Sequence, residues 1–337
     1  MSANDVLAAV PDSERDRLER CRMPEWVEPM LATLTHERFS KDGWIFERKF
    51  DGERCLAFRD GGRPRLMSRN RKSLNAHYPE VVEALAAQDL TRFVVDGEVV
   101  AFSGGVSSFS RLQARMHVDD PEAARNTGVA VTYYVFDVLH LGDYKVSRLP
   151  QRRRKALLKR FLSFADPLRF TPHRNAEGEA YFEDACRKGW EGIIAKDAGA
   201  AYAHTRSRHW LKFKCVAQQE LVVGGFTDPH GQRSGFGALL LGYYEGRDLR
   251  YAGKVGTGFD EDTLDRLGRR LRSLESDQSP FERDDDLPER EVHWVKPELV
   301  AEIGFEEWTK TDRLRQPRFL GLREDKAAED VVREDPG

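Results

Sequence analysis

The stretch Glu-Arg-Lys-Phe-Asp-Gly-Glu-Arg at residues 47–54 is the most informative part of this chain. Lys49 lies at the end of an apolar run that begins at Trp44, and the turn-forming pair Asp51-Gly52 follows it. A lysine at the end of an apolar strand can be partly removed from water, which lowers its pKa and exposes a neutral amine nucleophile. The same residues are also typical of an Asp-Gly hairpin with a surface lysine, so the rest of the chain must distinguish the two interpretations.

The sequence around this stretch, from residue 44 to residue 100, favours strands with one helix. The run at residues 129–139 is rich in Val, Tyr and Phe and indicates a buried strand. Helices are predicted to begin at Pro79 and Pro150 and to cover residues 178–188. The helix after Pro150 is strongly basic and carries an apolar stripe.

Beyond Cys215 the pattern changes to that of a small β domain. Strands are predicted at residues 221–226, 238–244, 249–255, 292–295 and 299–305, with a helix at 264–274 before the last two. This order fits the five-stranded OB-fold barrel better than a sandwich, with the acidic stretch 282–291 as a connecting loop.

The composition is that of a soluble globular protein: of 337 residues, 40% are hydrophobic and 33% are charged. Lys and Arg number 54 against 57 Asp and Glu, a net charge of -3, so a polyanionic partner would have to meet a local basic patch. No apolar run approaches the roughly 20 residues that span a bilayer, and the first thirty residues lack the apolar stretch of a signal peptide. We therefore expect a cytoplasmic protein without membrane contact.

The four cysteines, Cys21, Cys55, Cys186 and Cys215, are widely spaced. No two of them form the close pair that zinc ribbons and thioredoxin-like sites use. We expect reduced, mostly buried thiols.

Six further short motifs follow the lysine motif along the chain. They are Ser68-Arg69-Asn70, Asp96-Gly97-Glu98, Tyr134-Val135-Phe136-Asp137, Glu191-Gly192-Ile193-Ile194-Ala195-Lys196, Trp210-Leu211-Lys212-Phe213-Lys214 and Arg323-Glu324-Asp325-Lys326. Together with Lys-x-Asp-Gly-x-Arg at Lys49, they resemble the motifs of the covalent nucleotidyltransferases, the superfamily of ATP-dependent DNA ligases, RNA ligases and mRNA capping enzymes. Each motif is weak alone, but the complete set in the expected order is not expected by chance.

Within the superfamily, the chain most resembles the ligase module of bacterial non-homologous end-joining ligases, of the ligase D and ligase C type. The resemblance extends from Pro24 to Lys326 and includes the longer stretches 94–102, 254–259 and 319–326. The polymerase and phosphoesterase modules of multidomain ligase D proteins would have no room here, so we expect a stand-alone minimal ligase.

The resemblance implies an α+β fold in two domains. A nucleotidyltransferase (adenylation) domain of antiparallel sheets with flanking helices would be followed by a C-terminal OB-fold β-barrel. The expected boundaries are an N-terminal extension at residues 1–22, the adenylation domain at 23–215, the OB-fold domain at 216–326 and a disordered tail at 327–337.

Glu98 and Glu191 are the candidate metal ligands. Each lies beside a glycine that admits close backbone approach, and their hard oxygens suit the Mg²⁺ that accompanies a nucleoside triphosphate, with Mn²⁺ as the alternative ion. Two surface carboxylates at strand ends would look the same in the sequence.

Lys212 and Lys214 alternate with Leu211 and Phe213, so a strand would place both ammonium groups on one face. Two cations held in this way could stabilise charge on the α-phosphate as Lys49 attacks. A solvated edge strand protected by lysines is the alternative interpretation.

The resemblance also implies how the adenine of ATP is held. Phe136 would stack on the base, Glu47 would contact its edge, and Ile194 and Lys196 would belong to the same nucleotide-binding set. From the residues alone, Phe136 is equally typical of a buried core position.

Four basic residues would contact phosphates or ribose by the same resemblance. Arg54 and Arg69 would hold the ribose and the 5′-phosphate side of the substrate, and Arg323 and Lys326 would clamp the departing pyrophosphate. Many ligases have glycine after Ser-Arg-Asn, whereas Arg71 stands here, so this turn is expected to differ. Arg323 and Lys326 could otherwise belong to a charged, solvated tail.

Basic clusters at residues 69–72, 152–155 and 204–208 could each neutralise DNA phosphates and make binding salt-dependent. A solvated surface would have the same composition. Arg206 and Arg208 are the preferred DNA contacts because they lie only a few residues before Lys212.

These observations predict an ATP-dependent DNA ligase that acts on nicked or broken double-stranded DNA in bacterial repair or end joining. The cofactors would be ATP and a divalent cation, the protein would be a monomer in the cytoplasm that joins the nucleoid during repair, and the end-binding protein Ku is a candidate partner. An RNA ligase or a capping guanylyltransferase would use the same lysine. A catalytically silent OB-fold nucleic-acid binder is the alternative from another class.

Overall fold

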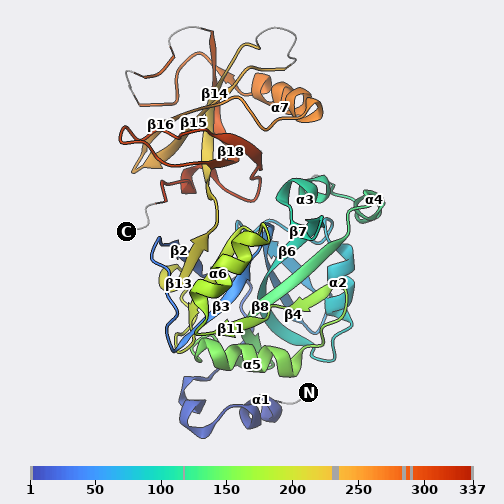
Figure 1. Cartoon of the computed structure of the whole chain (residues 1–337). Helices are drawn as coiled ribbons and strands as arrows, with labels where there is room; N and C mark the ends of the chain where they lie inside the picture. Colours follow the sequence, from blue (N-terminus) through green and yellow to red (C-terminus); the bar gives the residue numbers. More distant parts are fainter. Residues whose placement is uncertain (1–2, 117, 230–234, 283–285, 289–290, 335–337) are drawn as a thin grey trace. The chain divides into compact units, whose positions relative to one another are not determined.

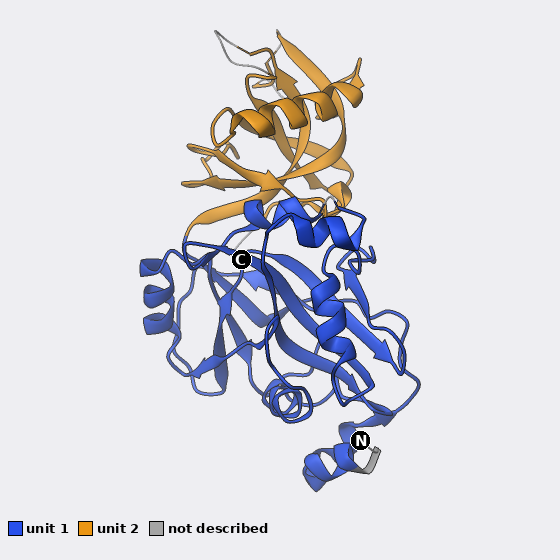
Figure 2. Ribbon diagram, turned by 90° about the vertical axis from the view of Figure 1, so that its right-hand side faces the viewer, with its two compact units in different colours: residues 1–215, 336–337 blue, residues 216–335 orange. Residues whose placement is uncertain are grey.

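The computed structural model describes residues 3–116, 118–229, 235–282, 286–288 and 291–334. The chain divides into two compact units, of which the first ends at Cys215 and the second begins at Val216 (Figure 2). Each unit has its own hydrophobic core, so each is described separately.

The larger sheet of the first unit has eight strands within the described residues, in the order β1-β9-β8-β6-β4-β5, with β10 beside β8 and β7 beside β6. The strands are β1 (Glu19–Arg20), β4 (Glu53–Asp60), β5 (Arg65–Ser68), β6 (Arg92–Ser103), β7 (Val106–Ser107), β8 (Val131–Leu141), β9 (Tyr144–Lys145) and β10 (Leu168–Phe170). The central strands β6 and β8 are the most apolar and lie in the core, which confirms the buried strand predicted at residues 129–139.

The second sheet of this unit has five strands in the described part of the chain, in the order β11-β3-β12-β13-β2. They are β2 (Leu31–Leu34), β3 (Trp44–Lys49), β11 (His173–Asn175), β12 (Gly192–Asp197) and β13 (Arg206–Lys214). Figure 1 shows the helix α6 (Gly178–Arg187) beside β3, and it packs against β3 and β12. The helix predicted at residues 178–188 is thereby confirmed.

The remaining helices of the first unit are α1 (Ala3–Ala9), η1 (Asp12–Arg17), α2 (Pro79–Ala86), α3 (Phe109–Met116), α4 (Pro121–Asn126) and α5 (Gln151–Phe161). Of these, α3 packs against β6 and α5 packs against β8. Pro79 occupies the first turn of α2 and Pro150 the N-cap of α5, so both predicted starts are confirmed. The sequence interpretation did not include α3 or α4. No helix among the described residues is long and apolar enough to cross a membrane.

The second unit is built on one curled, antiparallel sheet of six strands among the described residues, in the order β16-β15-β14-β18-β17 with β19 beside β18. The elements are β14 (Ala217–Thr227), β15 (Leu239–Glu245), β16 (Asp248–Val255), α7 (Glu261–Ser273), β17 (Glu275–Ser276), β18 (Val292–Phe305), β19 (Arg318–Leu322) and η2 (Ala328–Asp330). The helix α7 begins where Asp260 caps it by accepting a hydrogen bond from Thr263 N–H at 2.8 Å. This arrangement agrees with the expected C-terminal OB-fold domain.

Two boundaries in the second unit differ from the prediction. The strands expected at 292–295 and 299–305 form one continuous strand, β18, because its residues pair along β14 on both sides of a register shift. The tail expected to be disordered from residue 327 is packed up to residue 334: Ala328 and Val331 lie in the core, and Val331 O accepts a hydrogen bond from Tyr244 N–H at 2.7 Å. Residues 335–337 lie outside the described part of the chain, as do parts of the predicted loop at 282–291.

The expectation of reduced thiols is wrong for one pair, because Cys186 and Cys215 form a disulfide. They are 29 residues apart in the sequence, but the antiparallel pairing of β12 with β13 returns the chain to the end of α6. Their Cα atoms consequently lie 5.3 Å apart. Cys55 is a buried free thiol and Cys21 a partly exposed one.

Candidate active site

Lys49 lies at the carboxyl end of β3, where its side chain is 21% exposed and forms an ion pair with Glu191. Glu191 immediately precedes β12, and the register of the two strands places Gly192 opposite Lys49. The Glu191 side chain is only 7% exposed, so water screens the pair weakly. A lysine becomes a nucleophile after its ammonium group loses a proton. Glu191 forms an ion pair with the Lys49 Nζ group that carries this proton. The arrangement can therefore support nucleophilic chemistry at Lys49 Nζ.

The Asp51-Gly52 turn after Lys49 is not a surface hairpin, because β3 and β4 belong to different sheets. Asp51 Oδ2 accepts a hydrogen bond from Phe109 N–H at 3.0 Å, and Asp51 N–H donates to Ser107 Oγ at 3.1 Å. At Gly52, a Cβ atom would lie 2.3 Å from Val99 O, a distance that real side chains do not tolerate. The turn is thus anchored on both sides, and Gly52 is needed for the close approach to β6.

Six of the predicted site residues share one face of the smaller sheet, and Lys196 lies on it two residues after Ile194 on β12. The register aligns Glu47 with Ile194 and Ile194 with Lys212, while Lys49 and Lys214 occupy the next row. Residues directly opposite on paired strands point to the same face. The intervening residues lie on the opposite face in the core beneath α6, and they are Phe46, Ile193, Ala195, Leu211 and Phe213. The predicted alternation of Lys212 and Lys214 with apolar residues is confirmed, whereas their role toward phosphate stays a prediction.

The residues predicted to hold adenine lie close together. Phe136 is 9% exposed and belongs to a hydrophobic cluster against which Ile194 packs. Lys196 Nζ lies 4.3 Å from the Phe136 ring centroid and 4.1 Å from that of Trp210. Glu47 is buried and forms an ion pair with Lys196. The adenine contacts themselves stay predictions.

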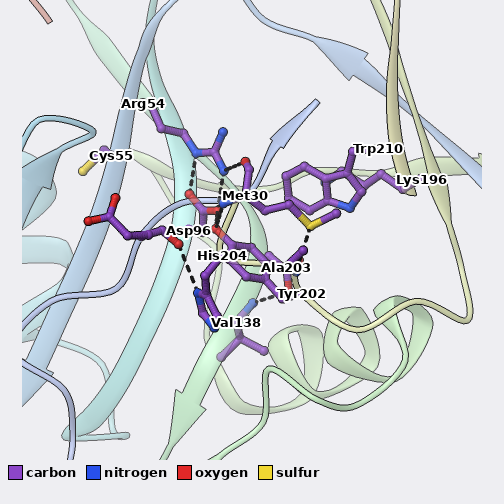
Figure 3. Close-up of polar contacts among 12 residues, drawn as sticks. Met30, Arg54, Cys55, Asp96, Val138, Lys196, Tyr202, Ala203, His204 and Trp210 are labelled. Atoms are coloured by element: carbon purple, nitrogen blue, oxygen red, sulfur yellow. Dashed lines mark hydrogen bonds and ion pairs between the residues drawn. The ribbon is translucent and has the colours of Figure 1, made fainter. Parts of the chain in front are cut away.

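The Arg54 guanidinium is held by the buried carboxylate of Asp96 (Figure 3). Asp96 was not among the predicted site residues. Two Arg54 nitrogens donate to Asp96 at 2.6 Å each and one also donates to Met30 O at 3.1 Å, while Tyr202 O–H donates to Asp96 at 2.6 Å. Burial alone would lower the pKa of Arg54, but the Asp96 charge outweighs it and the pKa is raised. Burial and the same charge raise the pKa of Tyr202. Asp96 stands two residues before Glu98 in its motif, and that was the signal available in the sequence.

The two candidate metal ligands come from different sheets. Glu98 lies on β6, opposite Arg54 on β4, and Glu191 precedes β12. The described residues contain no group of three or more His, Cys, Asp or Glu side chains that could hold a metal ion. Mg²⁺ in nucleotide sites typically takes one or two carboxylates and completes its shell with phosphate oxygens and water, so two glutamates fit such an ion.

The turn after Ser-Arg-Asn has the backbone conformation that favours glycine, although Arg71 stands there, so the expected difference in this turn is not seen in the backbone. Arg71 has φ 61°, in the left-handed region that favours glycine, and its guanidinium lies 5.1 Å from the Trp26 ring centroid. Arg71 also bonds Glu28, and this hydrogen bond lowers the pKa of Glu28, with a smaller effect from the charge of Arg69. Arg69 itself is partly exposed just after β5, and its predicted substrate contact stays a prediction.

Arg206 and Arg208 are both exposed on β13; Arg206 precedes the register shift between Ser207 and Leu211, and Arg208 lies within it. Arg206 Nη1 donates to Ala32 O at 2.7 Å, which ties it to β2. Their exposure suits a phosphate contact, and contact with DNA stays a prediction.

The basic cluster at 152–155 is only partly a surface feature. Arg154 and Lys155 are buried, Arg154 forms a two-bond ion pair with Asp137 at 2.7 and 2.9 Å, and Lys155 pairs with Glu47. These two residues are therefore not available to bind DNA phosphates.

Arg323 and Lys326 lie in the second unit and are not part of a solvated tail. Arg323 is 10% exposed and bonds Asp325 at 2.8 and 2.9 Å and Glu302 at 2.6 Å, while Lys326 pairs with Glu220 at 2.9 Å. Burial would lower the pKa of Arg323, but Asp325 and Glu302 outweigh it and the pKa is raised. The structure thus shows these cations paired with carboxylates, and their contact with pyrophosphate stays a prediction.

Comparison with known proteins adds an independent line of observation. The first unit matches the family model described as "ATP dependent DNA ligase domain" over residues 29–214, and the second unit matches "ATP dependent DNA ligase C terminal region" over residues 232–326. A similar curated protein is the multifunctional non-homologous end joining protein LigD of Pseudomonas aeruginosa, 36% identical over 323 residues, which cover 93% of this chain and 37% of that protein.

Two mycobacterial proteins are also similar. The multifunctional non-homologous end joining DNA repair protein LigD of Mycobacterium tuberculosis is 39% identical over 315 residues, 91% of this chain and 40% of that protein. A solved structure described as mycobacterial DNA ligase D complexed with ATP and MES has a TM-score of 0.64 and 36% identity, covering 91% of this chain and 98% of that one. The chain spans about two fifths of the length of the curated relatives named above.

Proposed function

Because this chain belongs to the family of ATP-dependent DNA ligases, we propose that it seals nicks or broken ends in DNA through a covalent AMP on Lys49. The observation that carries the proposal is the Lys49–Glu191 pair, set beside Lys212 and Lys214 on one face of a sheet. A nucleophile, a carboxylate and two further cations are the groups that nucleotidyl transfer requires.

In the proposed first step, Lys49 Nζ attacks the α-phosphorus of ATP. A nitrogen–phosphorus bond forms, the bond from the α-phosphorus to the bridging oxygen breaks, and pyrophosphate leaves. Nζ must be neutral to attack, and Glu191, which forms an ion pair with it, would receive its proton. Lys212 and Lys214 stabilise the negative charge that builds up on the α-phosphate.

The next two steps consume the lysyl-adenylate. A DNA 5′-phosphate takes the AMP from Lys49, and the neighbouring 3′-hydroxyl then displaces the AMP and closes the strand. Lys212 and Lys214 serve these steps in the same way, because negative charge builds up on a phosphate in each step. Arg206 and Arg208 hold the DNA backbone through salt-dependent phosphate contacts.

Glu98 and Glu191 would hold the divalent ion, Mg²⁺ or in its place Mn²⁺. The ion would supply positive charge to the phosphates of ATP. Glu191 would then have two tasks, because it also contacts Lys49.

The names of the similar proteins support a role in end joining. Two of them are non-homologous end joining proteins, and a break bound by Ku is the substrate that such a role implies for this chain. We place the reaction in the cytoplasm, at the nucleoid, with the ligase acting as a monomer.

An RNA ligase or a capping guanylyltransferase is less well supported, because the family models and the similar proteins are DNA ligases. A silent nucleic-acid binder would leave the partly buried Lys49–Glu191 pair without a use. Parallel assays of nicked DNA, nicked RNA and GTP test the proposal. We expect sealing of nicked DNA with ATP; label transfer from GTP alone, or sealing of RNA alone, would contradict it.

A further inference from the structure

One carboxylate and two lysines form a buried cluster on the active-site face of the smaller sheet. Glu47, Lys155 and Lys196 are each only 2% exposed. Lys155 Nζ lies 2.5 Å from Glu47 Oε1, and Lys196 Nζ lies 2.6 Å from Glu47 Oε2. Each oxygen of the Glu47 carboxylate is therefore held by its own ammonium group.

Lys155 is anchored from outside this sheet. It comes from α5, and its Nζ donates a hydrogen bond to Thr171 O at 2.8 Å and lies 4.5 Å from the Phe170 ring centroid. Thr171 follows β10 and precedes β11, the strand that pairs with β3 through Glu47 and His173. The position of Lys155 is thus set by the fold and not by Glu47 alone.

Two cations take the place of water around the Glu47 carboxylate. Removing a carboxylate from water is unfavourable unless cations and hydrogen-bond donors replace the water, and here two cations do so. Burial lowers the pKa of Lys196. The charge of Glu47 opposes this lowering, and the charge of Lys155 adds to it. An ionised carboxylate is a pure acceptor with about four lone-pair sites. Each Glu47 oxygen meets one ammonium group and has further lone pairs, so the carboxylate retains capacity to accept a hydrogen bond from a ligand.

We propose that Lys155 is a positioning residue that sets the nucleobase selectivity of the enzyme by fixing Glu47 as a charged acceptor for the 6-amino group of adenine. This inference rests on the proposed function. A fixed carboxylate accepts a hydrogen bond from the amino group of adenine and repels the 6-oxo group of guanine. Without Lys155, Glu47 keeps one ammonium and is free to turn about its own side-chain bonds, so the acceptor is no longer fixed.

The test compares covalent nucleotide transfer to the enzyme from ATP and from purine riboside triphosphate, which lacks the 6-amino group. A buried acceptor left without its donor typically costs a factor of about 10 to 100 in kcat/KM. We expect the unaltered enzyme to prefer ATP by roughly this factor, and Lys155→Met to reduce the preference about tenfold. Lys155→Arg should retain most of it. Lys159→Met is the matched control, because Lys159 is an exposed lysine on the same helix, and its preference should be unchanged.

A double substitution separates positioning from a general loss of structure. If Lys155 acts through Glu47, Lys155→Met should have no further effect on the ATP preference in a Glu47→Gln background. A merely structural role would lower the rates with both nucleotides and leave their ratio unchanged, which would overturn the inference. Equal use of the two nucleotides by the unaltered enzyme would also overturn it. Absence of any covalent nucleotide on the unaltered enzyme would instead contradict the proposed function.

Discussion

Removing the Asp137 carboxylate should strongly destabilise the first unit. Asp137 and Arg154 are both fully buried and are joined by two hydrogen bonds, at 2.7 and 2.9 Å. In Asp137→Ala the guanidinium would keep its bonds to Leu149 O, Ala200 O and Gln151 but would lose its counter-charge. Breaking a buried ion pair from one side typically costs about 3–5 kcal/mol. Because three contacts remain, we expect the lower end, about 3 kcal/mol.

Urea unfolding monitored by fluorescence, together with thermal unfolding, measures this effect. A loss of about 3 kcal/mol corresponds to a fall in Tm of roughly 6–12 °C for a unit of this size. Asp60→Ala is the control, because the pair of Asp60 with Arg92 is 64% and 36% exposed and should be worth less than about 1 kcal/mol. Asp137→Ala combined with Arg154→Met should recover part of the stability, since no uncompensated charge is then buried.

The same pair predicts a pH dependence. Burial would raise the pKa of Asp137, but the charge of Arg154 outweighs it and the pKa is lowered. A carboxyl group with a lowered folded-state pKa adds stability above its unfolded value, about 3.9, and loses it as the pH falls below that value. The stability difference between the unaltered protein and Asp137→Ala should therefore shrink as the pH is lowered from 7 to 3. A difference below about 1 kcal/mol at pH 7, or one that grows in acid, would show that the Asp137 charge does not stabilise the buried Arg154.

Three further predictions concern function. Gly52→Ala should abolish adenylation, because the new Cβ would lie 2.3 Å from Val99 O; normal covalent AMP formation, measured by intact mass, would show that the turn can shift. Lys326→Ala should lose most adenylation by ATP yet seal a nick whose 5′ end already carries AMP, which rapid-quench measurement of both steps can check. Arg206→Ala with Arg208→Ala should weaken DNA binding at 0.1 M salt about tenfold and flatten its salt dependence while adenylation persists, as fluorescence anisotropy can test. Unchanged anisotropy would move the DNA contact elsewhere.

Local patterns in the sequence predicted the elements that carry the site. The alternation of Lys212 and Lys214 with Leu211 and Phe213 placed both lysines on one face, as the structure has them. The leucine repeat from Leu264 predicted α7, and prolines marked the starts of two helices. These features depend on residues within a few positions of one another, which is why the sequence shows them.

Contacts between distant segments could not be predicted in the same way. Arg154 and Lys155 stand in a run of four basic residues that looks solvated, and only the fold brings Asp137 and Glu47 to them. The same holds for Asp96, whose partner Arg54 comes from a neighbouring strand. A buried cation and a surface cation are identical in sequence, so the partners must be seen in three dimensions.

The disulfide and the full length of one strand could not be predicted from the sequence. Their spacing excluded a metal knuckle but gave no reason to pair Cys186 with Cys215, because their proximity depends on the return of β13 along β12. The sequence predicts two strands, at 292–295 and 299–305, where pairing with β14 makes one long strand, β18.

The most direct test of the central claim is the mass of the intact protein after incubation with ATP and Mg²⁺, followed by peptide mapping. We expect a mass gain of one AMP on Lys49, loss of that AMP when nicked DNA is added, and no gain in Lys49→Ala. A failure to gain mass, or an AMP located on another residue, would contradict that claim.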